Sequence, residues 1–526
     1  MTIHRIPLAR LLMCAVATVG GGSVQAATND ALPPNETPGV PIPPGQIDAA
    51  VGRLDQLAQQ LMARSGIPGM SVAVVHDGQK VFAKGYGVRK MGEPDLVDAD
   101  TVFQLASLSK SVGATVVAYE VGKKVVGWNE PVVKYLPWFA LSDPWVTAHL
   151  TVGDLYAHRS GLPDHAGDDL EDIGYDRGQV LERLRYLQLE PFRSTYEYTN
   201  FGVTAAAEAV AAAAGTDWAT LAERALYRPL HMDRTSSRFA DFEKRPNHAY
   251  GHVKSGGVYQ PKYQRQPDAQ SPAGGVSSSA NDMAQWLAML IDNGNAQGQP
   301  LIPAAALLPA ITPQVISRAA TAPTVRADMY GYGFNVGVQP SGRTNFSHSG
   351  AFALGAGTAF AVLPSERVGI VVLTNAAPIG VPESLIAEFM QLVQFGNITR
   401  DWFAAYQPLF APYSQPAGSL FGKQPPPNPV PARPLGAYVS DYGNNYFGTA
   451  RVIQDSGGMA LVLGPKDLRL PMRHWDGDRF VVYMHSENYE EGSVSAVDFK
   501  IAGTGQASSM KVELLDSNKL GTFTRR

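Results

Sequence analysis

With 526 residues, the chain is too long for one ordinary domain, so we expect a large domain and at least one smaller one. Hydrophobic residues make up 45% and charged residues 17%, a balance within the normal range for a folded soluble protein. The formal net charge of −4 gives no reason to expect nucleic acid or an anionic membrane as a partner.

Residues 1–26 have the pattern of an export signal. A basic start is followed by the apolar run LLMCAVATV, too short for a lasting membrane anchor, and by small residues that allow cleavage after Ala26. We therefore predict a periplasmic or secreted protein with no stable membrane span after signal removal. A membrane-anchored N-terminus is the less favoured alternative. The only cysteine, Cys14, lies in this segment, so the mature chain would have no disulfide, cysteine nucleophile or zinc–thiolate site.

The next two segments are predicted to be a flexible tail and a helix. Residues 27–46 are rich in proline and polar residues, which favours a tail with little structure. Apolar residues then recur at spacings of three and four from Ile47 to Leu61, as in a helix with one buried face. Gly66 and Pro68 are expected to end that helix.

Two hairpins are predicted far apart in the chain. Residues 70–88 read as two strands around the turn Asp77–Gly78, and residues 357–375 read as two more around residues 364–366. A helix should follow over 382–393. Strands near both ends with helical sequence between them predict an α+β fold, in which distant segments close one antiparallel sheet.

The C-terminal part has a different character. Repeated prolines in residues 411–434 favour a stiff, extended linker. Residues 435–526 contain short β-type runs separated by glycine and aspartate turns, which predict a small all-β domain, either a barrel or a sandwich. Ser508 and Lys511 in this domain have a Ser-x-x-Lys spacing, but on a strand they would point to opposite faces, so we interpret the pair as chance.

The same spacing at Ser107 and Lys110 has a different setting, because it falls at the start of an apolar helix. On a helix, residues three apart share a face, so the hydroxyl and the amine can meet. The helix N-terminus favours developing negative charge, and burial would make the lysine a base. The alternative is a serine that caps the helix beside a solvated lysine, and the tetrad alone does not exclude it.

Two further segments bear on this choice. Residues 196–202 read YEYTNFG, with Tyr198 and Asn200, and residues 345–355 read NFSHSGAFALG, with His348. Taken singly, Tyr198 is better explained as a core or rim aromatic, and His348 as a hydrogen-bonded strand histidine.

Together with SLSK at 107–110, these segments resemble, in order and spacing, the three active-site motifs of the class C β-lactamase and penicillin-binding serine hydrolase family. Residues 150–165 and 271–287 are also similar to family segments, and the resemblance covers roughly residues 45–400. It implies a β-lactamase-like domain over 47–410, with an antiparallel sheet flanked by helices and a mostly helical subdomain. The all-β domain resembles the C-terminal appendage of some members.

The resemblance implies roles for five residues. Ser107 would be the nucleophile of an acyl-enzyme, and Lys110 would take or relay its proton. Tyr198 would act as partner base and then as proton donor, useful near neutral pH only if Lys110 lowers its pKa. Asn200 would hold the substrate amide and orient Lys110. The backbone N–H groups of Ser107 and Ala351 would form the oxyanion hole.

The third motif departs from the β-lactamase pattern. Class C β-lactamases usually have Lys-Thr-Gly, whereas this chain has His348–Ser349–Gly350, which looks more like the D,D-peptidases, D-aminopeptidases and esterases of the family. A histidine is mostly neutral near pH 7, so it would grip a β-lactam carboxylate less well. Gly350 still leaves room for backbone to approach the acyl group. The resemblance also implies that His348 lies on an edge strand alongside the Ser107 helix.

Other chemistries lack their motifs. The sequence contains no G-x-S-x-G, no H-E-x-x-H and no glycine-rich phosphate loop. His248 and His252 lie four apart, but Gly251 weakens any helix there, so metal binding is disfavoured. His158 is predicted to buttress a turn near the site. We expect no cofactor and no metal.

The sequence therefore predicts an exported serine hydrolase that cleaves an amide or ester bond through an acyl-enzyme on Ser107. The favoured activity is that of a peptidase or amidase on small peptides, with a carboxylesterase close behind and a β-lactamase possible by the same chemistry. A non-catalytic penicillin-binding or scaffold protein is the alternative from another class. The expected partner is a small molecule or short peptide, and no oligomeric state is predicted.

Overall fold

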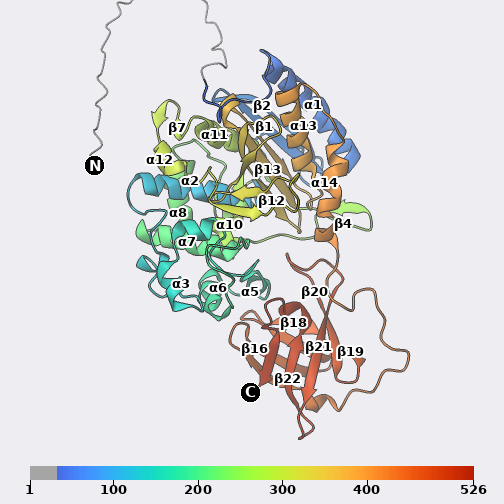
Figure 1. Cartoon of the computed structure of the whole chain (residues 1–526). Helices are drawn as coiled ribbons and strands as arrows, with labels where there is room; N and C mark the ends of the chain where they lie inside the picture. Colours follow the sequence, from blue (N-terminus) through green and yellow to red (C-terminus); the bar gives the residue numbers. More distant parts are fainter. Residues whose placement is uncertain (1–31) are drawn as a thin grey trace, which may run out of the picture.

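The computed structural model describes residues 32–526. The predicted export signal, residues 1–26, and the start of the predicted tail lie outside the described residues. Figure 1 shows a large domain of helices and strands, with a smaller β domain below it. Within residues 32–526, no helix combines the length and apolar character needed to cross a bilayer.

The large domain is built on an eight-stranded antiparallel sheet that joins both ends of the domain, as the hairpins predicted. In sheet order its strands are β2 (Gln79–Gly87), β1 (Gly69–His76), β14 (Val368–Thr374), β13 (Ala356–Leu363), β12 (Thr344–Phe352), β11 (Asn335–Val338), β10 (Asp328–Tyr330) and β9 (Val315–Arg318). The first hairpin turns at Asp77 and Gly78, both with positive φ, as a tight two-residue turn requires.

Two helices cover one face of this sheet: α1 (Gln46–Ser65) and α13 (Val381–Phe395). Leu54 of α1 and Phe389 of α13 are fully buried together with Val72 and Val74 of β1. The intervening Ala73 belongs to the core on the other face, because side chains alternate along a strand. Both predicted helices are confirmed, and α14 (Trp402–Phe410) follows them.

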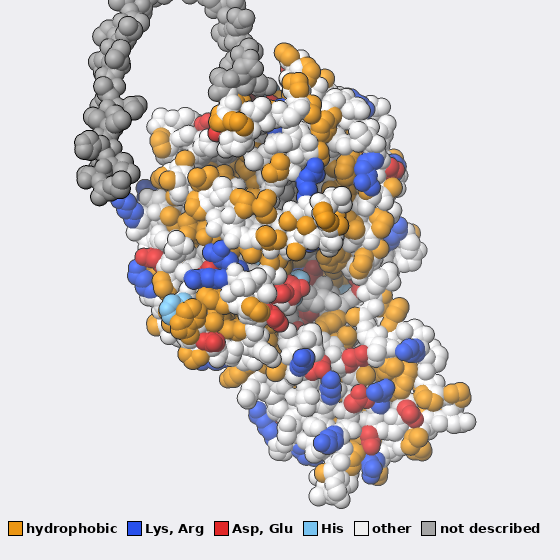
Figure 2. All heavy atoms as spheres, viewed as in Figure 1, with side chains coloured by type: hydrophobic (Ala, Val, Ile, Leu, Met, Phe, Trp, Pro, Cys, Tyr) orange, Lys and Arg blue, Asp and Glu red, His pale blue; other side chains and the backbone are white. Residues whose placement is uncertain are grey.

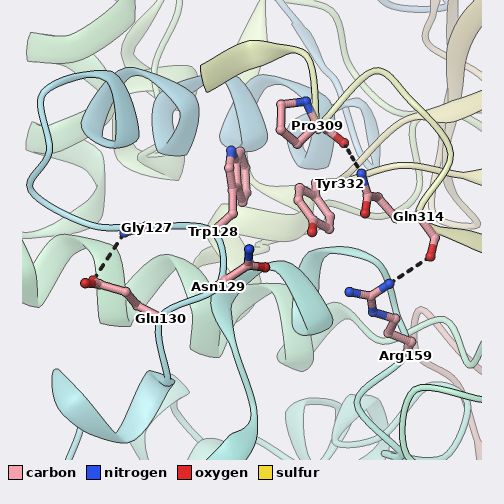
Figure 3. Close-up of a pocket in the computed structure, with 8 residues that line it drawn as sticks. All are labelled: Gly127, Trp128, Asn129, Glu130, Arg159, Pro309, Gln314 and Tyr332. Carbon is pink, nitrogen blue, oxygen red and sulfur yellow. Dashed lines mark hydrogen bonds between the residues drawn. The ribbon is translucent and has the colours of Figure 1, made fainter. Parts of the chain in front are cut away.

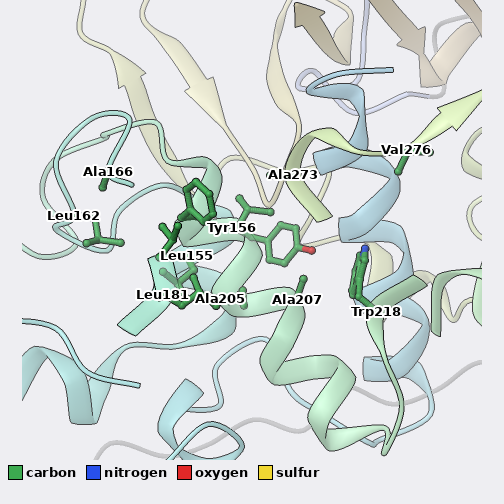
Figure 4. Packing of buried hydrophobic residues seen from close by; sticks show 14 of the residues in the cluster. Leu155, Tyr156, Leu162, Ala166, Leu181, Ala205, Ala207, Trp218, Ala273 and Val276 are labelled. Carbon is green, nitrogen blue, oxygen red and sulfur yellow. The ribbon is translucent and has the colours of Figure 1, made fainter. Parts of the chain in front are cut away.

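The other face of the sheet carries α11 (Ala280–Ile291) and α2 (Leu108–Gly122), and α2 runs through the centre of the domain. Figure 4 shows how Tyr156 and Trp218 point toward α2 from neighbouring helices. A Cβ added at Gly113 would lie 3.1 Å from the Tyr156 hydroxyl oxygen. Such close packing leaves little room for water around α2, so its buried polar side chains need protein partners.

The helical subdomain packs around α2. Its helices are α3 (Pro144–His149), α4 (Val152–Tyr156), α5 (Asp168–Asp172), α6 (Arg177–Arg183), α7 (Asn200–Ala213), α8 (Trp218–Ala222), α9 (Phe239–Lys244), α10 (Ser271–Gly274) and α12 (Ala304–Leu307). A short pair, β3 (Phe103–Gln104) with β6 (Ser277–Ser278), anchors the segment that enters α2. Two further pairs are β4 (Val253–Ser255) with β5 (Val258–Gln260), and β7 (Asn295–Ala296) with β8 (Gln299–Pro300).

The C-terminal domain is a single nine-stranded antiparallel sheet that curls into a nearly closed barrel, rather than a sandwich. In sheet order its strands are β18 (Leu468–Pro471), β17 (Gly458–Leu463), β16 (Gly448–Asp455), β15 (Ser440–Asn444), β23 (Thr522–Arg525), β22 (Ala507–Val512), β21 (Ser493–Ile501), β20 (Arg479–Met484) and β19 (Arg473–Asp476). Ser508 binds the carbonyl of Lys500, whereas Lys511 pairs with Asp516, so this second Ser-x-x-Lys is not a site.

The proline-rich segment 411–434 lies along the barrel. Leu420 is buried in a cluster with Trp475 and Val494, and the Val494 N–H donates to the Ala417 carbonyl. The contacts of Leu420 and Ala417 fix the middle of the segment against the barrel, while Phe421 and the prolines after it stay exposed.

Candidate active site

Ser107 stands where the chain enters α2. Ala106, just before it, has φ of +48°, a left-handed conformation that is unfavourable for alanine and turns the chain sharply into the helix. Ser107 occupies the capping position, but its side chain makes no capping hydrogen bond. Its hydroxyl instead contacts Lys110 and Tyr198. The simple helix-cap interpretation therefore does not describe this serine.

Lys110 is fully buried beneath Ser107. Its Nζ lies 3.1 Å from Ser107 Oγ, 2.7 Å from Asn200 Oδ1 and 3.0 Å from the Ala273 carbonyl oxygen. Burial lowers the pKa of Lys110 to about 7, although the nearby Asp168 carboxylate acts in the opposite direction. A neutral amine has two N–H donors and one lone pair. The two carbonyl-type oxygens take the donors, which leaves the lone pair for the Ser107 hydroxyl proton.

Tyr198 approaches the serine from the segment before α7. Its hydroxyl donates to Ser107 Oγ at 2.7 Å, and its ring centre lies 4.5 Å from Lys110 Nζ. Burial raises the pKa of Tyr198 well above its usual value. The condition stated for a phenolate base near neutral pH, a lowered pKa, is therefore not met, because burial outweighs the hydrogen bond to Ser107, which acts in the lowering direction. Tyr198 is suited to donate a proton rather than to start as a phenolate base.

Asn200, the first residue of α7, has both ends of its carboxamide engaged. Oδ1 accepts from Lys110, and Nδ2 donates to Asp168 Oδ2 at 2.8 Å. Such pairing holds the amide in one orientation and directs its oxygen at Lys110. The predicted orientation of Lys110 by Asn200 thus has a direct geometric basis.

His348 lies on β12, buried beside Tyr330. The Tyr330 hydroxyl lies 2.8 Å from Nε2, and the Ser349 carbonyl oxygen lies 2.6 Å from Nδ1. These partners assign the ring proton to Nδ1, because a carbonyl can only accept. Burial, aided by the Lys110 charge, lowers the pKa of His348 to about 3. The third motif therefore presents a neutral ring, in agreement with the sequence-based expectation.

The backbone of β12 lies directly against Ser107. A Cβ added at Gly350 would sit 2.4 Å from the Leu105 carbonyl oxygen and 3.0 Å from the Ser107 nitrogen, so only glycine fits. Strand β11 pairs with β12 as far as Ser347. Beyond it, the edge that carries Ala351 is left open beside the start of α2. The two predicted oxyanion donors, Ser107 and Ala351, thus lie on adjoining segments.

Two expectations about β12 need correction. It is not an edge strand of the sheet, since β11, β10 and β9 continue beyond it, and only its second half has an open edge. The strand pleat also turns the Ser349 side chain away from the face of His348. The Ser349 hydroxyl faces Glu383 in the first turn of α13, where it partly offsets the effect of burial, which raises the pKa of Glu383 to about 7. Ser349 can therefore reach a substrate only through its backbone.

His158 supports Tyr198, as its predicted buttressing role implies. The ring is buried, its Nδ1 accepts the Thr199 N–H at 3.1 Å, and its centre lies 4.6 Å from that of Tyr198. Burial lowers the pKa of His158 well below its usual value, so the ring is neutral. The histidine positions the tyrosine segment from behind, and within residues 32–526 it makes no hydrogen bond to Ser107 Oγ.

Two contributors to the site had no usable sequence signal. The Ala273 carbonyl is a backbone group, and residue type says nothing about where such a group points. Asp168 sits in the acidic run DDLED, which reads as a solvated helix face. The other histidine pair makes contacts of its own: Nδ1 of His248 and Nδ1 of His252 lie within hydrogen-bond distance of the carbonyl oxygens of Arg245 and Asn375.

The barrel reaches the rim of the site. Glu487 accepts the Ala353 N–H at 2.6 Å, just after β12, and lies 3.8 Å from Arg265. A pocket of about 230 Å³, lined in part by Gln104, Arg265 and Phe352, adjoins this contact. Figure 2 shows a hollow between the two domains with acidic and histidine side chains inside it.

A second pocket lies apart from this site. It has a volume of about 550 Å³ and contains Trp128, Arg159 and Tyr332 in its lining (Figure 3). Arg159 donates to the Gln314 carbonyl and pairs with Asp154, so its guanidinium is already engaged. None of the motif residues lines this pocket, and it is not a candidate for the reaction.

Comparison with known proteins decides the family. The family model described as Beta-lactamase matches residues 54–394. The protein belongs to the Beta-lactamase family. The family match, the fold and the relatives together show that this protein is a serine hydrolase. A second family model, described as a domain of unknown function (DUF3471), matches residues 424–522, which include the barrel strands from β15 to β22.

Several characterised proteins are similar to this family member. It is 27% identical over 444 residues to unguisins hydrolase ungD' of Aspergillus campestris (strain IBT 28561), covering 79% of this chain and 80% of that protein. It is 23% identical over 342 residues to D-alanyl-D-alanine-carboxypeptidase/endopeptidase AmpH of Escherichia coli (strain K12), covering 62% and 84%. It is 27% identical over 319 residues to penicillin-binding protein 4 of Amycolatopsis lactamdurans, covering 59% and 81%.

Two solved structures share the fold. The octameric penicillin-binding protein homologue from Pyrococcus abyssi superposes with a TM-score of 0.57 at 19% identity, covering 88% of this chain and 98% of that one. The class C beta lactamase from Rhodobacter sphaeroides superposes with a TM-score of 0.52 at 21% identity, covering 66% and 98%. At these identities the likeness concerns the fold alone.

Proposed function

We propose that this protein is an exported serine hydrolase that cleaves an amide or ester bond through an acyl-enzyme on Ser107, with small peptides or their amides as preferred substrates. Residues 1–26 are the proposed export signal. The observation that carries the proposal is the contact of Ser107 Oγ with Lys110 Nζ at 3.1 Å and with the Tyr198 hydroxyl at 2.7 Å. A serine hydroxyl becomes a strong nucleophile only when a neighbouring base takes its proton. Lys110, with a pKa of about 7, is suited to do so near neutral pH.

In the proposed reaction, Ser107 Oγ attacks the substrate carbonyl carbon while Lys110 accepts the hydroxyl proton. The N–H groups of Ser107 and Ala351 donate to the oxygen that becomes negative. Tyr198 gives its proton to the leaving group, and Lys110 replaces that proton with the one it took from Ser107. Water then cleaves the acyl-enzyme by the same steps in reverse, which restores the Ser107 hydroxyl.

The preference for peptides and amides has two supports. The neutral, buried His348 offers no ion pair to a β-lactam carboxylate, which disfavours efficient β-lactam hydrolysis. Among the similar proteins, AmpH is named a D-alanyl-D-alanine-carboxypeptidase/endopeptidase. An esterase would use the same nucleophile and oxyanion donors, so it is the second candidate.

A substrate panel tests this proposal. The full-length protein without its signal is assayed with p-nitrophenyl esters, nitrocefin, D-amino-acid amides and short peptides, against a Ser107→Ala preparation as the blank. We expect the highest kcat/KM on amides or peptides. Turnover of nitrocefin far above that of peptides would show that the preference is wrong, and turnover of esters alone would favour the esterase.

A Tyr198→Phe variant tests the role of proton donor. An amine leaving group needs a proton, whereas p-nitrophenoxide does not. We therefore expect the variant to lose on the order of 10²- to 10⁴-fold in kcat/KM on an amide, and much less on the p-nitrophenyl ester of the same acyl group. The matched control is Tyr196→Phe, because the Tyr196 ring packs against His158 and Tyr330 in the same segment. Equal losses on amide and ester would assign the proton donation to another group.

A further inference from the structure

Helix α5 carries a run of acidic residues that divide their contacts between the two domains. Asp168 faces the active site, whereas Asp169 and Asp172 face the barrel. Figure 1 places α5 at the lower edge of the large domain, next to the barrel. None of the three motifs includes this helix, and the proposed reaction does not use it.

We propose that Asp168 is a positioning residue for acyl transfer, which holds Asn200 and Lys110 in their reactive arrangement, and that the C-terminal barrel keeps Asp168 in place through α5. This inference rests on the proposed function, since it assigns Lys110 as the base. Within residues 32–526 the Asp168 side chain makes no hydrogen bond to Ser107, and it acts through Asn200 and through its charge.

The link from Asp168 to the base is short. Asp168 is buried, with 4% of its surface exposed, and its Oδ2 accepts from Asn200 Nδ2 at 2.8 Å. The other end of that carboxamide accepts from Lys110 Nζ at 2.7 Å. If the carboxylate were removed, the amide could turn, and Lys110 would then lose a fixed acceptor. Among residues 32–526, no protein group donates a hydrogen bond to Asp168 Oδ1.

The groups around Lys110 make Asp168 the main negative charge acting on it. Burial lowers the pKa of Lys110, and the Asp168 carboxylate opposes that change. The other titratable neighbours of Lys110 are Tyr198, His158, His348 and His165. Tyr198, His158 and His348 are held neutral by burial.

Asp168 has charged and titratable neighbours of its own. Burial lowers the pKa of His165, but the hydrogen bond to Asp168 at 2.8 Å and the charges of Asp168 and Asp164 together outweigh burial and raise the pKa overall. Burial raises the pKa of Asp169 and that of Tyr446, and the Asp168 charge raises both further. Because the Asp168 carboxylate opposes the lowering of the Lys110 pKa by burial, removal of the Asp168 charge should lower the pKa of Lys110 further.

The barrel holds α5 at both ends. The Tyr446 hydroxyl donates to Asp169 Oδ1 at 2.9 Å and accepts the Gly167 N–H at 3.1 Å, at the start of the helix. Ser486 and Asn488 donate to Asp172 Oδ2 at 2.6 and 2.9 Å, at its end. A helix of one turn has little stability of its own, so these contacts decide where it lies.

The test measures kcat/KM against pH on the best substrate of the panel, using full-length variants with normal thermal unfolding. Lys110 must be neutral to accept a proton, so the acid limb of the profile follows its pKa. Asp168→Asn should move this limb to lower pH and lower the plateau by roughly tenfold to a hundredfold, because the base is both less basic and less well placed. Asp176→Asn is the matched control, because it makes the same chemical change at the residue that caps α6. Asparagine and aspartate are about equally good at this capping position.

A second set of variants tests the contact between the barrel and α5. Ser486→Ala with Asn488→Ala should shift the limb in the same direction by a smaller amount, while Ser508→Ala on β22 should leave the profile unchanged. If Asp168→Asn does not fold, the double variant still tests whether the position of α5 affects Lys110. A lower plateau with an unmoved limb in Asp168→Asn would reduce Asp168 to a structural role and overturn the inference. An unchanged profile in the double variant would overturn the barrel link.

These outcomes differ from failure of the proposed function. If the wild-type protein neither turns over any panel substrate nor reacts with a fluorophosphonate, the acyl-enzyme itself is wrong, and the inference about Asp168 falls with it. If the wild type is active and only the variants behave unexpectedly, the acyl-enzyme stands and the role of Asp168 is rejected.

Discussion

Ser107→Ala is expected to abolish covalent labelling by a fluorophosphonate and to lower kcat/KM on the best substrate by on the order of 10⁴- to 10⁶-fold. The reason is direct: Ser107 Oγ is the oxygen to which both Lys110 and Tyr198 lie within hydrogen-bond distance. Alanine removes the atom that forms the acyl bond but leaves the helix entry unchanged, because the serine side chain does not cap α2.

Labelling is measured by intact mass, and the modified peptide is identified after digestion. Ser508→Ala is the control, since Ser508 has the same spacing to a lysine but binds the Lys500 carbonyl on a barrel strand. It should label at the wild-type rate. A Ser107→Ala protein that still gains one adduct at normal speed would place the nucleophile elsewhere and remove the basis of the proposed function.

Lys110→Met is expected to lower kcat/KM by roughly 10²- to 10⁴-fold, the usual contribution of a general base. Methionine fills much of the same volume, but it has no lone pair for the Ser107 proton and no donor for Asn200 Oδ1 or the Ala273 carbonyl. The side chain is fully buried, so water cannot readily take the place of the amine.

The pH dependence distinguishes a lost base from a damaged pocket. The wild-type kcat/KM should fall as the pH drops below about 7, because protonated Lys110 cannot accept the serine proton. In Lys110→Met that limb should disappear, and the residual rate should be flat across the same range. Lys511→Met is the control, as Lys511 pairs with Asp516 on the barrel surface and should keep the full profile. An acid limb near pH 7 that persists in Lys110→Met would belong to another group.

Local sequence patterns predicted much of the fold because each reflects a short-range rule. The spacing of apolar residues identified α1 and α13, and the Asp77–Gly78 turn identified the first hairpin. Short β-type runs that alternate with turns do not, however, distinguish a barrel from a sandwich. That choice depends on which strands pair at the edges of the sheet, and only long-range contacts decide it.

The site shows the same division between residue type and surroundings. Ser107, Lys110, Tyr198 and Asn200 stand at motif positions, and the structure brings all four together. The direction of the Tyr198 pKa was not predictable, because it depends on how completely other segments exclude water from the ring. Strand pairing likewise decides that the Ser349 side chain faces away from the site and that β12 lies inside the sheet rather than at its edge. Residue type does not specify that pairing.

The sequence by itself determined the chemical groups, their order along the chain and the local elements that carry them, since these depend on residue identity and on spacings of a few residues. The tertiary structure alone decided their protonation and support. Lys110 loses solvent because α2 is buried on all sides, and Asp168 reaches Asn200 because α5 is held between the two domains. Burial and charge depend on neighbours from distant parts of the chain, and those neighbours exist only once the chain has folded.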